Sequence, residues 1–300
     1  MDKKEAFLKK DRIIKAITED GFFKLSVVKT TDVVRQAQKR HELGLLATVL
    51  LGRALTGTML LASELKAEER VRLKMEGNGP LGMLTAEANS TGEIRGFVQN
   101  KDAVLDYDTA ERIGDGLGLG VLSVSKTLYD EARPTTGTVE LISGNVSQDL
   151  SHYLMQSEQV RSAISLDVGI NDNGEVTHAG GVLIQALPGA PDEKIEKVQE
   201  NFATMPAVAE QLADGSYIDD ILNEIIGPYK IKELGRWPVH FFCRCSKDRF
   251  KGALKMLGVD ELRDMLDQGQ ELVCHFCNSR YVVRADELQA IIDENQTRMN

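Results

Sequence analysis

The stretch LGLLATVLLGRALTGTMLLASEL, residues 43–65, is the most hydrophobic part of this 300-residue sequence. Arg53 lies near its centre, and glycines and hydroxyl side chains interrupt the apolar run. A membrane-spanning helix carries few or no charges, whereas a helix that is apolar on all sides is also found buried in protein cores. We therefore predict a buried core helix over this stretch and not a membrane span.

Segments of strand composition lie on both sides of this helix. We expect strands at residues 22–28, 71–75, 83–88, 94–98, 121–128, 138–141, 165–170 and 179–186. Further helices are expected after Thr31, a candidate N-cap, and from Ser147 to Gln159. Because strands and helices do not alternate strictly, the sequence predicts an α+β fold for an N-terminal core domain, residues 1–187, with β-sheets and packed helices.

An acidic segment follows the break at Pro188-Gly189-Ala190-Pro191. Residues 191–226 carry nine acidic side chains against Lys194 and Lys197, and apolar residues recur at three- and four-residue steps. One interpretation is a helical hairpin packed on the main domain. The other is a segment that depends on tertiary contacts to stay folded, because like charges crowd its polar face. We assign residues 188–235 to an acidic helical linker that is conditionally folded, and call it the acidic segment.

The four cysteines of the chain form two close pairs near its C-terminus, Cys243 with Cys245 and Cys274 with Cys277. In a cytosolic protein, clustered cysteines more often indicate metal or redox chemistry than structural disulfides. Two tight turns that each present two sulfurs suit one tetrahedral zinc ion. We predict a C-terminal zinc domain, residues 236–300, whose thin core depends on the roughly 10–16 kcal/mol that zinc binding contributes.

Local signals divide this domain into short elements. Ser246 is a candidate cap for a helix that ends at Gly258, and Asp260 for another that continues to Gly269. Strands are expected at residues 239–242, 271–273 and 281–283, with a last helix capped by Asp286.

The sequence pattern leaves open whether the zinc site is structural or redox-active. Structural sites are the commoner use of four cysteines. The close Cys-x-Cys spacing and the surrounding cations favour redox chemistry, because nearby positive charge stabilises the thiolate that oxidants attack. The cations are Arg244, Lys247, Arg249, Arg280 and Arg284. His240 and His275 are further candidate ligands, although thiolates bind zinc more strongly.

Other features exclude several functions. The net charge of −10 lies entirely within residues 1–235, so the body of the protein lacks the basic face that nucleic-acid binding requires. The glycine-rich run at residues 114–120 lacks the G-x-G-x-x-G spacing of a phosphate loop. His41, His152 and His178 form no evident catalytic group, and we predict no enzyme activity. Residues 1–5 lead into no apolar segment typical of a secretory signal, so we expect a cytoplasmic protein.

A set of short motifs runs along the whole chain. They are LGRAL at 51–55, GNGPLG at 77–82, RGFV at 95–98, SEQ at 157–159, AGGVLIQ at 179–185, FCRCS at 242–246 and CHFC at 274–277. With them the chain resembles the heat-shock protein 33 family, the bacterial redox-regulated holdase chaperones. It departs from the family pattern at His275, where an acidic residue often stands, and at Asn278, which often is glycine. These departures bear on the sensitivity of the switch and not on ligation.

The resemblance implies an inactive reduced state in which one zinc ion is held by Cys243, Cys245, Cys274 and Cys277. Peroxide with mild unfolding, or hypochlorous acid, then forms the disulfides Cys243–Cys245 and Cys274–Cys277 and expels zinc. The C-terminal domain and the acidic segment unfold, and the exposed apolar surface binds unfolding client proteins without ATP. The family commonly forms a homodimer on oxidation, and neither nucleic acid nor membrane is an expected partner.

Two other classes of protein remain in view at this stage. A zinc-ribbon transcription or nucleic-acid-binding factor would need the basic surface that the acidic body lacks. A thiol oxidoreductase would use Cys274 and Cys277, but no thioredoxin-like βαβ pattern surrounds them.

Overall fold

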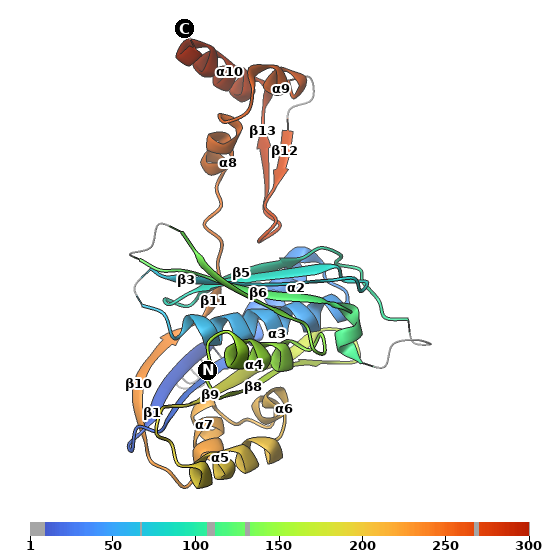
Figure 1. The fold of residues 1–300 in the computed structure, drawn as a ribbon. Helices are drawn as coiled ribbons and strands as arrows, with labels where there is room; N and C mark the ends of the chain where they lie inside the picture. Colours follow the sequence, from blue (N-terminus) through green and yellow to red (C-terminus); the bar gives the residue numbers. More distant parts are fainter. Residues whose placement is uncertain (1–9, 67, 107–111, 130–132, 267–269, 300) are drawn as a thin grey trace, which may run out of the picture. The chain divides into compact units, whose positions relative to one another are not determined.

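The computed structural model describes residues 10–66, 68–106, 112–129, 133–266 and 270–299 (Figure 1). The chain divides after Phe242 into two compact units. The α+β prediction is confirmed, since each unit combines helices with antiparallel strands. The predicted domain boundaries at residues 187 and 235 and the conditional folding of the acidic segment stay predictions.

Helix α3 (Leu45–Ala62) is the centre of the first unit, and it lies between two β-sheets (Figure 1). It packs on β2, β8 and β9 of one sheet and on β3, β4 and β5 of the other. By length and composition it could cross a membrane, but 83% of it is buried inside the protein. Sheets on two sides explain why its sequence is apolar all round, and the predicted buried helix is confirmed.

The five-stranded sheet has the order β10-β1-β2-β9-β8, and the six-stranded sheet has the order β11-β5-β4-β3-β6-β7. The first contains β1 (Arg12–Thr18), β2 (Phe23–Lys29), β8 (Ser162–Ile170), β9 (Val176–Ala186) and β10 (Ile231–Pro238). The second contains β3 (Arg70–Gly77), β4 (Met83–Asn89), β5 (Glu93–Val98), β6 (Gly120–Thr127), β7 (Thr135–Glu140) and β11 (His240–Phe241). Neighbouring strands are antiparallel, except that β11 runs parallel to β5.

Two helices and a glycine-rich loop complete the core. Helix α2 (Thr31–His41) begins after Thr30, so the predicted N-cap Thr31 is wrong by one residue. Asp11 supplies the cap instead, because an oxygen of its carboxyl group accepts a hydrogen bond from the Val33 amide at 2.8 Å. Helix α4 (Val146–Gln156) packs on α3 and β8.

The glycine-rich run holds a short 3₁₀ turn, η1 (Ile113–Gly116), and packs against the backbone of its neighbours. A Cβ atom on Gly120 would lie 1.9 Å from the Glu76 carbonyl oxygen. The glycines of this run therefore permit close backbone packing, which agrees with the prediction that it is not a phosphate loop.

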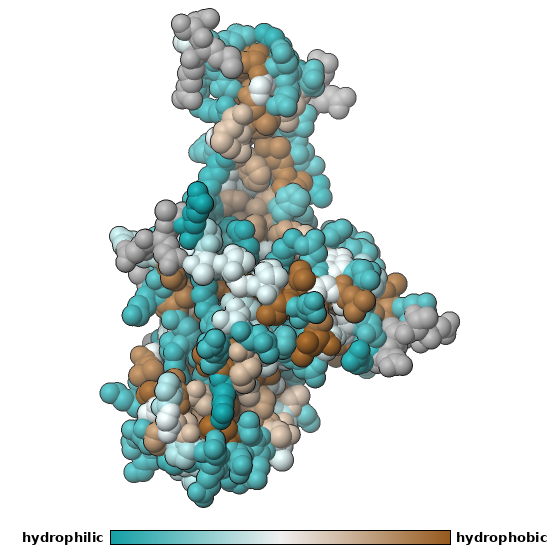
Figure 2. All heavy atoms as spheres, viewed as in Figure 1, coloured by the Kyte–Doolittle hydropathy of each residue, from teal (hydrophilic) through white to brown (hydrophobic). Residues whose placement is uncertain are grey.

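Three helices of the acidic segment cover the outer face of the five-stranded sheet. They are α5 (Asp192–Thr204), α6 (Val208–Ala213) and α7 (Ile218–Ile226). Their apolar side chains form one cluster with those of β1, β2 and β9, while the outward face visible in Figure 2 is mostly hydrophilic. The prediction that residues 231–235 belong to the helical linker is wrong. They belong to the edge strand β10, which pairs with β1.

The second unit consists of a hairpin and three helices. The elements are α8 (Lys247–Leu254), α9 (Val259–Asp264), β12 (Gln270–Val273), β13 (Arg280–Val283) and α10 (Ala285–Met299). The predicted end of the second helix at Gly269 lies outside the described residues. Ser246 caps α8 as predicted, accepting a hydrogen bond from the Arg249 amide. Six buried apolar side chains form the core, which is small for an independent fold.

Candidate functional site

Each cysteine pair lies in a short segment between regular elements. Cys243 and Cys245 follow β11 and directly precede the cap of α8. Cys274 and Cys277 lie in the turn between β12 and β13, where the Asn278 amide donates to the Cys274 carbonyl at 2.8 Å. Asn278 has a φ of +55°, in the left-handed region that glycine and asparagine adopt most readily. The backbone therefore explains why Asn278 can replace a glycine here.

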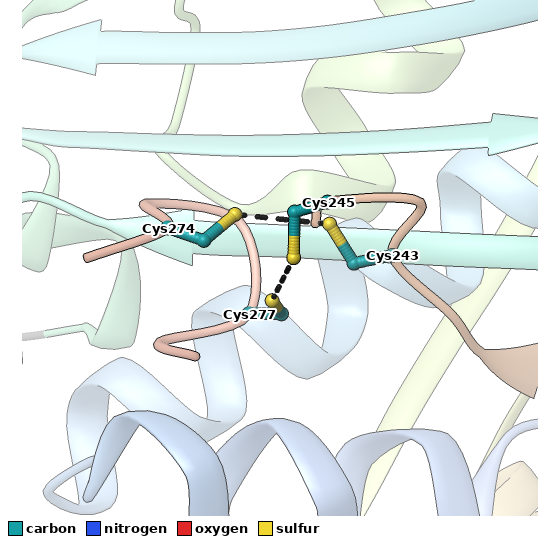
Figure 3. Close-up of side chains that lie close together, drawn as sticks. All are labelled: Cys243, Cys245, Cys274 and Cys277. Atoms are coloured by element: carbon teal, nitrogen blue, oxygen red, sulfur yellow. Dashed lines mark hydrogen bonds between the residues drawn. The ribbon is translucent and has the colours of Figure 1, made fainter. Parts of the chain in front are cut away.

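The two segments bring the four sulfur atoms together (Figure 3). All four lie within 4.8 Å of one another, with 3.7 Å from Cys243 to Cys274 and 3.3 Å from Cys245 to Cys277. A zinc ion with bonds of about 2.3 Å to each sulfur would separate the sulfurs of a tetrahedron by about 3.8 Å. The sulfurs are too far apart for disulfides, in which the bond is about 2.05 Å, and the thiols are free. The donor set and its spacing therefore fit a tetrahedral metal ion.

Burial and local hydrogen bonds shift the pKa values of the thiols in opposite directions. Burial raises the pKa of Cys274, and the neighbouring sulfur of Cys243 raises it further. Burial also acts to raise the pKa of Cys277, but hydrogen bonds from Ser279 and the other thiols lower it to about 7. Burial likewise raises the pKa of Cys245. The protein alone thus favours the thiolate at only one of these three positions, and a divalent cation would favour it at all four.

Two hydroxyl groups contact the sulfurs, and the sequence did not indicate either. Ser279 Oγ lies 3.3 Å from Cys277 Sγ, and Tyr281 Oη lies 3.2 Å from Cys245 Sγ. The Cys245 carbonyl oxygen also lies 3.2 Å from the Tyr281 hydroxyl, so the single hydroxyl proton is shared between the carbonyl and the sulfur whenever the sulfur is deprotonated. The hydrogen bond to Cys245 raises the pKa of Tyr281 to about 12, so its hydroxyl stays protonated near neutral pH.

Three of the five basic residues near the cysteines in sequence form ion pairs with carboxylates. Lys247 pairs with Glu287, Arg280 with Glu271, and Arg284 with Asp286. None of the cysteine pKa shifts has a neighbouring cation among its causes. The expectation that these side chains stabilise the thiolates is therefore not supported.

The two candidate histidine ligands do not join the sulfur cluster. His240 is exposed and makes an edge contact with the ring of Phe242, and His275 is also exposed. Among the described residues, the four cysteines are the single group of three or more potential ligands close enough to hold one metal ion. His41, His152 and His178 lie on α2, α4 and β9 respectively and do not form such a group.

Comparisons with known proteins cover almost the whole chain. The family model described as Hsp33 protein matches residues 11–284. A 33 kDa chaperonin of Levilactobacillus brevis is 37% identical over 293 residues, which cover 96% of this chain and 99% of the relative. One of Bacillus subtilis is 36% identical over 292 residues, covering 95% and 99%. The crystal structure of a 33 kDa chaperonin (heat shock protein 33 homolog) of Thermotoga maritima superposes with a TM-score of 0.88 at 32% identity, covering 96% of this chain and 99% of that one.

Proposed function

Because this chain belongs to the Hsp33 family of chaperones, which are not enzymes, we propose that it is a redox-regulated holdase that works without ATP. The observation that carries the redox part of the proposal is the convergence of four free thiols within 4.8 Å, in a chain that has no other cysteine. Thiols that are close together and free can either bind a metal ion or form disulfides.

In the reduced protein, Cys243, Cys245, Cys274 and Cys277 would ligate one zinc ion. Zinc bound to four thiolates would link the two cysteine-containing segments and contribute about 10–16 kcal/mol to the folding of the second unit. The core of that unit is small, and its buried apolar side chains are Leu254, Leu262, Val283, Leu288, Ile291 and Ile292. A core of this size supplies only a few kcal/mol at most, so the fold of the unit depends on the four thiolates remaining ligands.

Oxidation would remove these ligands in pairs. We propose the disulfides Cys243–Cys245 and Cys274–Cys277, which join residues close in sequence. For each disulfide, two thiolates give two electrons to one molecule of hydrogen peroxide, which takes up two protons from the solvent and leaves as two molecules of water. A disulfide sulfur carries no negative charge and no longer holds the metal, so the second unit loses its main source of stability.

Release of the acidic segment would then expose the apolar surface that binds clients. The helices α5–α7 cover an apolar sheet face that includes Phe23, Leu25 and Val27 of β2, each no more than 2% exposed. The apolar faces of the helices themselves, such as Ile221 and Ile225 of α7, would become accessible together with it. A contiguous apolar surface of this kind is what unfolding proteins bind through their own exposed side chains.

We further propose that the protein acts in the cytoplasm, where clients unfold under oxidative stress, and that the oxidised form is a homodimer. Reduction of the disulfides and rebinding of zinc would restore the covered state and release clients for refolding. The excess of acidic over basic side chains in residues 1–235 disfavours nucleic acid as a partner, and we propose no membrane partner.

The proposal is tested by following zinc, thiols and client protection in one sample. Before oxidation, we expect one zinc per chain, four protected thiols and no suppression of the aggregation of a thermally unfolding reporter enzyme. After peroxide at raised temperature, we expect no bound zinc, no free thiol and full suppression. Equal client protection in the two states would refute redox control while leaving the chaperone assignment intact.

A further inference from the structure

We propose that Tyr281 is a positioning residue of the cysteine cluster, whose hydroxyl group hydrogen-bonds to the Cys245 sulfur and so tightens metal binding and slows oxidation of that sulfur. The inference deepens the proposed function, on which it rests for the identity of the metal and of the oxidant. The observations that carry it are contacts of Tyr281 within the second unit.

Tyr281 connects the two halves of the cluster. It lies on β13, in the hairpin that also carries the turn of Cys274 and Cys277, and it pairs with Leu272 of β12. Its hydroxyl oxygen nevertheless lies 3.2 Å from the Cys245 sulfur and 3.2 Å from the Cys245 carbonyl oxygen. The hairpin of one cysteine pair therefore places a hydroxyl group within hydrogen-bond distance of both the side chain and the backbone of Cys245 in the other pair.

The direction of this hydrogen bond follows from the chemistry of the ligand. A thiolate has no proton, so the tyrosine hydroxyl is the donor whenever Cys245 is bound to a metal ion. The carbonyl oxygen of Cys245 competes for the same proton, but the charged thiolate is the stronger acceptor and draws the proton towards the sulfur. Four thiolates around one divalent cation leave an excess of negative charge, which a hydrogen-bond donor partly offsets. Donation also withdraws electron density from the sulfur, which makes it a weaker nucleophile towards peroxide. Partners of this kind change metal affinity by about 10- to 100-fold when they are mutated.

The neighbourhood of Tyr281 offers a clean substitution and two controls. Its ring contacts that of Phe250, with 5.4 Å between the ring centroids, so Tyr281→Phe keeps the packing and removes the hydroxyl alone. Phe250→Leu is the matched control, because it alters the ring contact and leaves the hydroxyl in place. Ser279→Ala removes the hydroxyl that lies 3.3 Å from the Cys277 sulfur and tests whether any hydroxyl near the cluster has the same effect.

The test uses the full-length reduced protein and has three readouts. They are the zinc affinity by chelator competition, the rate of zinc release in peroxide, and the absorption spectrum after replacement of zinc by cobalt(II). For Tyr281→Phe we expect an affinity about 10-fold lower or more, faster zinc release, and a thiolate-to-cobalt charge-transfer band shifted to lower energy. Phe250→Leu should leave the band in place. Ser279→Ala removes the hydrogen bond to the Cys277 sulfur and is expected to shift the band in the same direction as Tyr281→Phe.

The cobalt spectrum reports only on chains with a folded, metal-bound site, so partial unfolding of a variant does not imitate the shift. A Tyr281→Phe protein with an unshifted band and an affinity within twofold of the wild type overturns the inference. The same shift in Phe250→Leu also overturns it, since packing alone would then be the cause. If the wild type shows no charge-transfer band, the proposed metal site fails as well. If the band shifts but the oxidised wild type protects no client, only the proposed function fails.

Discussion

The packing of α7 predicts that Ile221→Ala opens the acidic segment without oxidation. Ile221 is fully buried in the cluster that joins the three helices to the five-stranded sheet. Truncation of a buried isoleucine to alanine costs about 2–5 kcal/mol, because apolar contacts are lost and a cavity remains. Each 1.4 kcal/mol is a factor of ten, so the open fraction of the segment rises roughly 30-fold to about 4,000-fold.

Two measurements on the reduced, zinc-bound variant check this prediction. Hydrogen exchange of residues 192–226 should be faster than in the wild type, while exchange in the cysteine-containing unit is unchanged. The variant should also suppress client aggregation in part, with all four thiols still reduced. Ile142→Ala is the matched control, because Ile142 is 58% exposed and its truncation is expected to change stability by no more than about 0.5 kcal/mol.

The two readouts separate the ways in which the reasoning can fail. Unchanged exchange would refute the assignment of Ile221 as a main contact of the segment. Faster exchange without client protection would be more serious, because it would show that uncovering the sheet face does not create the client-binding surface.

Three further predictions follow from other contacts. Arg236→Gln removes hydrogen bonds from β10 to the carboxylates of Asp219 on α7 and Glu233. Hydrogen exchange of α7 should become faster by an amount equivalent to about 1.5–3 kcal/mol, while zinc is retained. Burial raises the pKa of Asp11 to about 8, so the folded protein keeps a proton that the unfolded chain releases above about pH 4. The free energy of unfolding should therefore fall as the pH rises from 4 to 8. Asp11→Asn should flatten this decline, as measured by urea unfolding at several pH values. Cys277→Ser removes one thiolate, and we expect loss of zinc and rapid exchange throughout α10 in the reduced protein, whereas stoichiometric zinc would contradict the ligand assignment.

The positions of most elements could be predicted from the sequence, but their pairing could not. The run around α3 is apolar on every side, and this property alone indicates burial. Nothing in it specifies that β2 pairs with β9, which lies more than 140 residues further along the chain. Strand β10 was missed because five of its eight residues are charged, glycine or proline, and it is held at the sheet edge by backbone pairing with β1.

For the cysteine cluster as well, some features could be predicted from the sequence and others could not. Its four sulfurs could be predicted, because close spacing of the two pairs is a property of the sequence. The hydroxyl contact of Tyr281 could not, because a tyrosine in a short strand is indistinguishable by pattern from an ordinary packing residue. The expectation that Lys247 stabilises the thiolates is not supported, for a related reason. Its carboxylate partner, Glu287, is 40 residues away in the sequence, so closeness to Cys245 along the chain said little about its position in space.

The lengths of the three helices in the acidic segment bear on how small a change can release them. They span 13, 6 and 9 residues, and helices of such lengths are marginal or unstable in water on their own. Their net charge adds repulsion, which is partly relieved by ion pairs such as those between Lys194 and Asp20 and between Arg236 and Asp219. Packing on the sheet face is therefore the main source of their stability. We therefore expect that a loss of a few kcal/mol of this packing free energy, or of the contacts of Arg236, would raise the unfolded fraction of the segment.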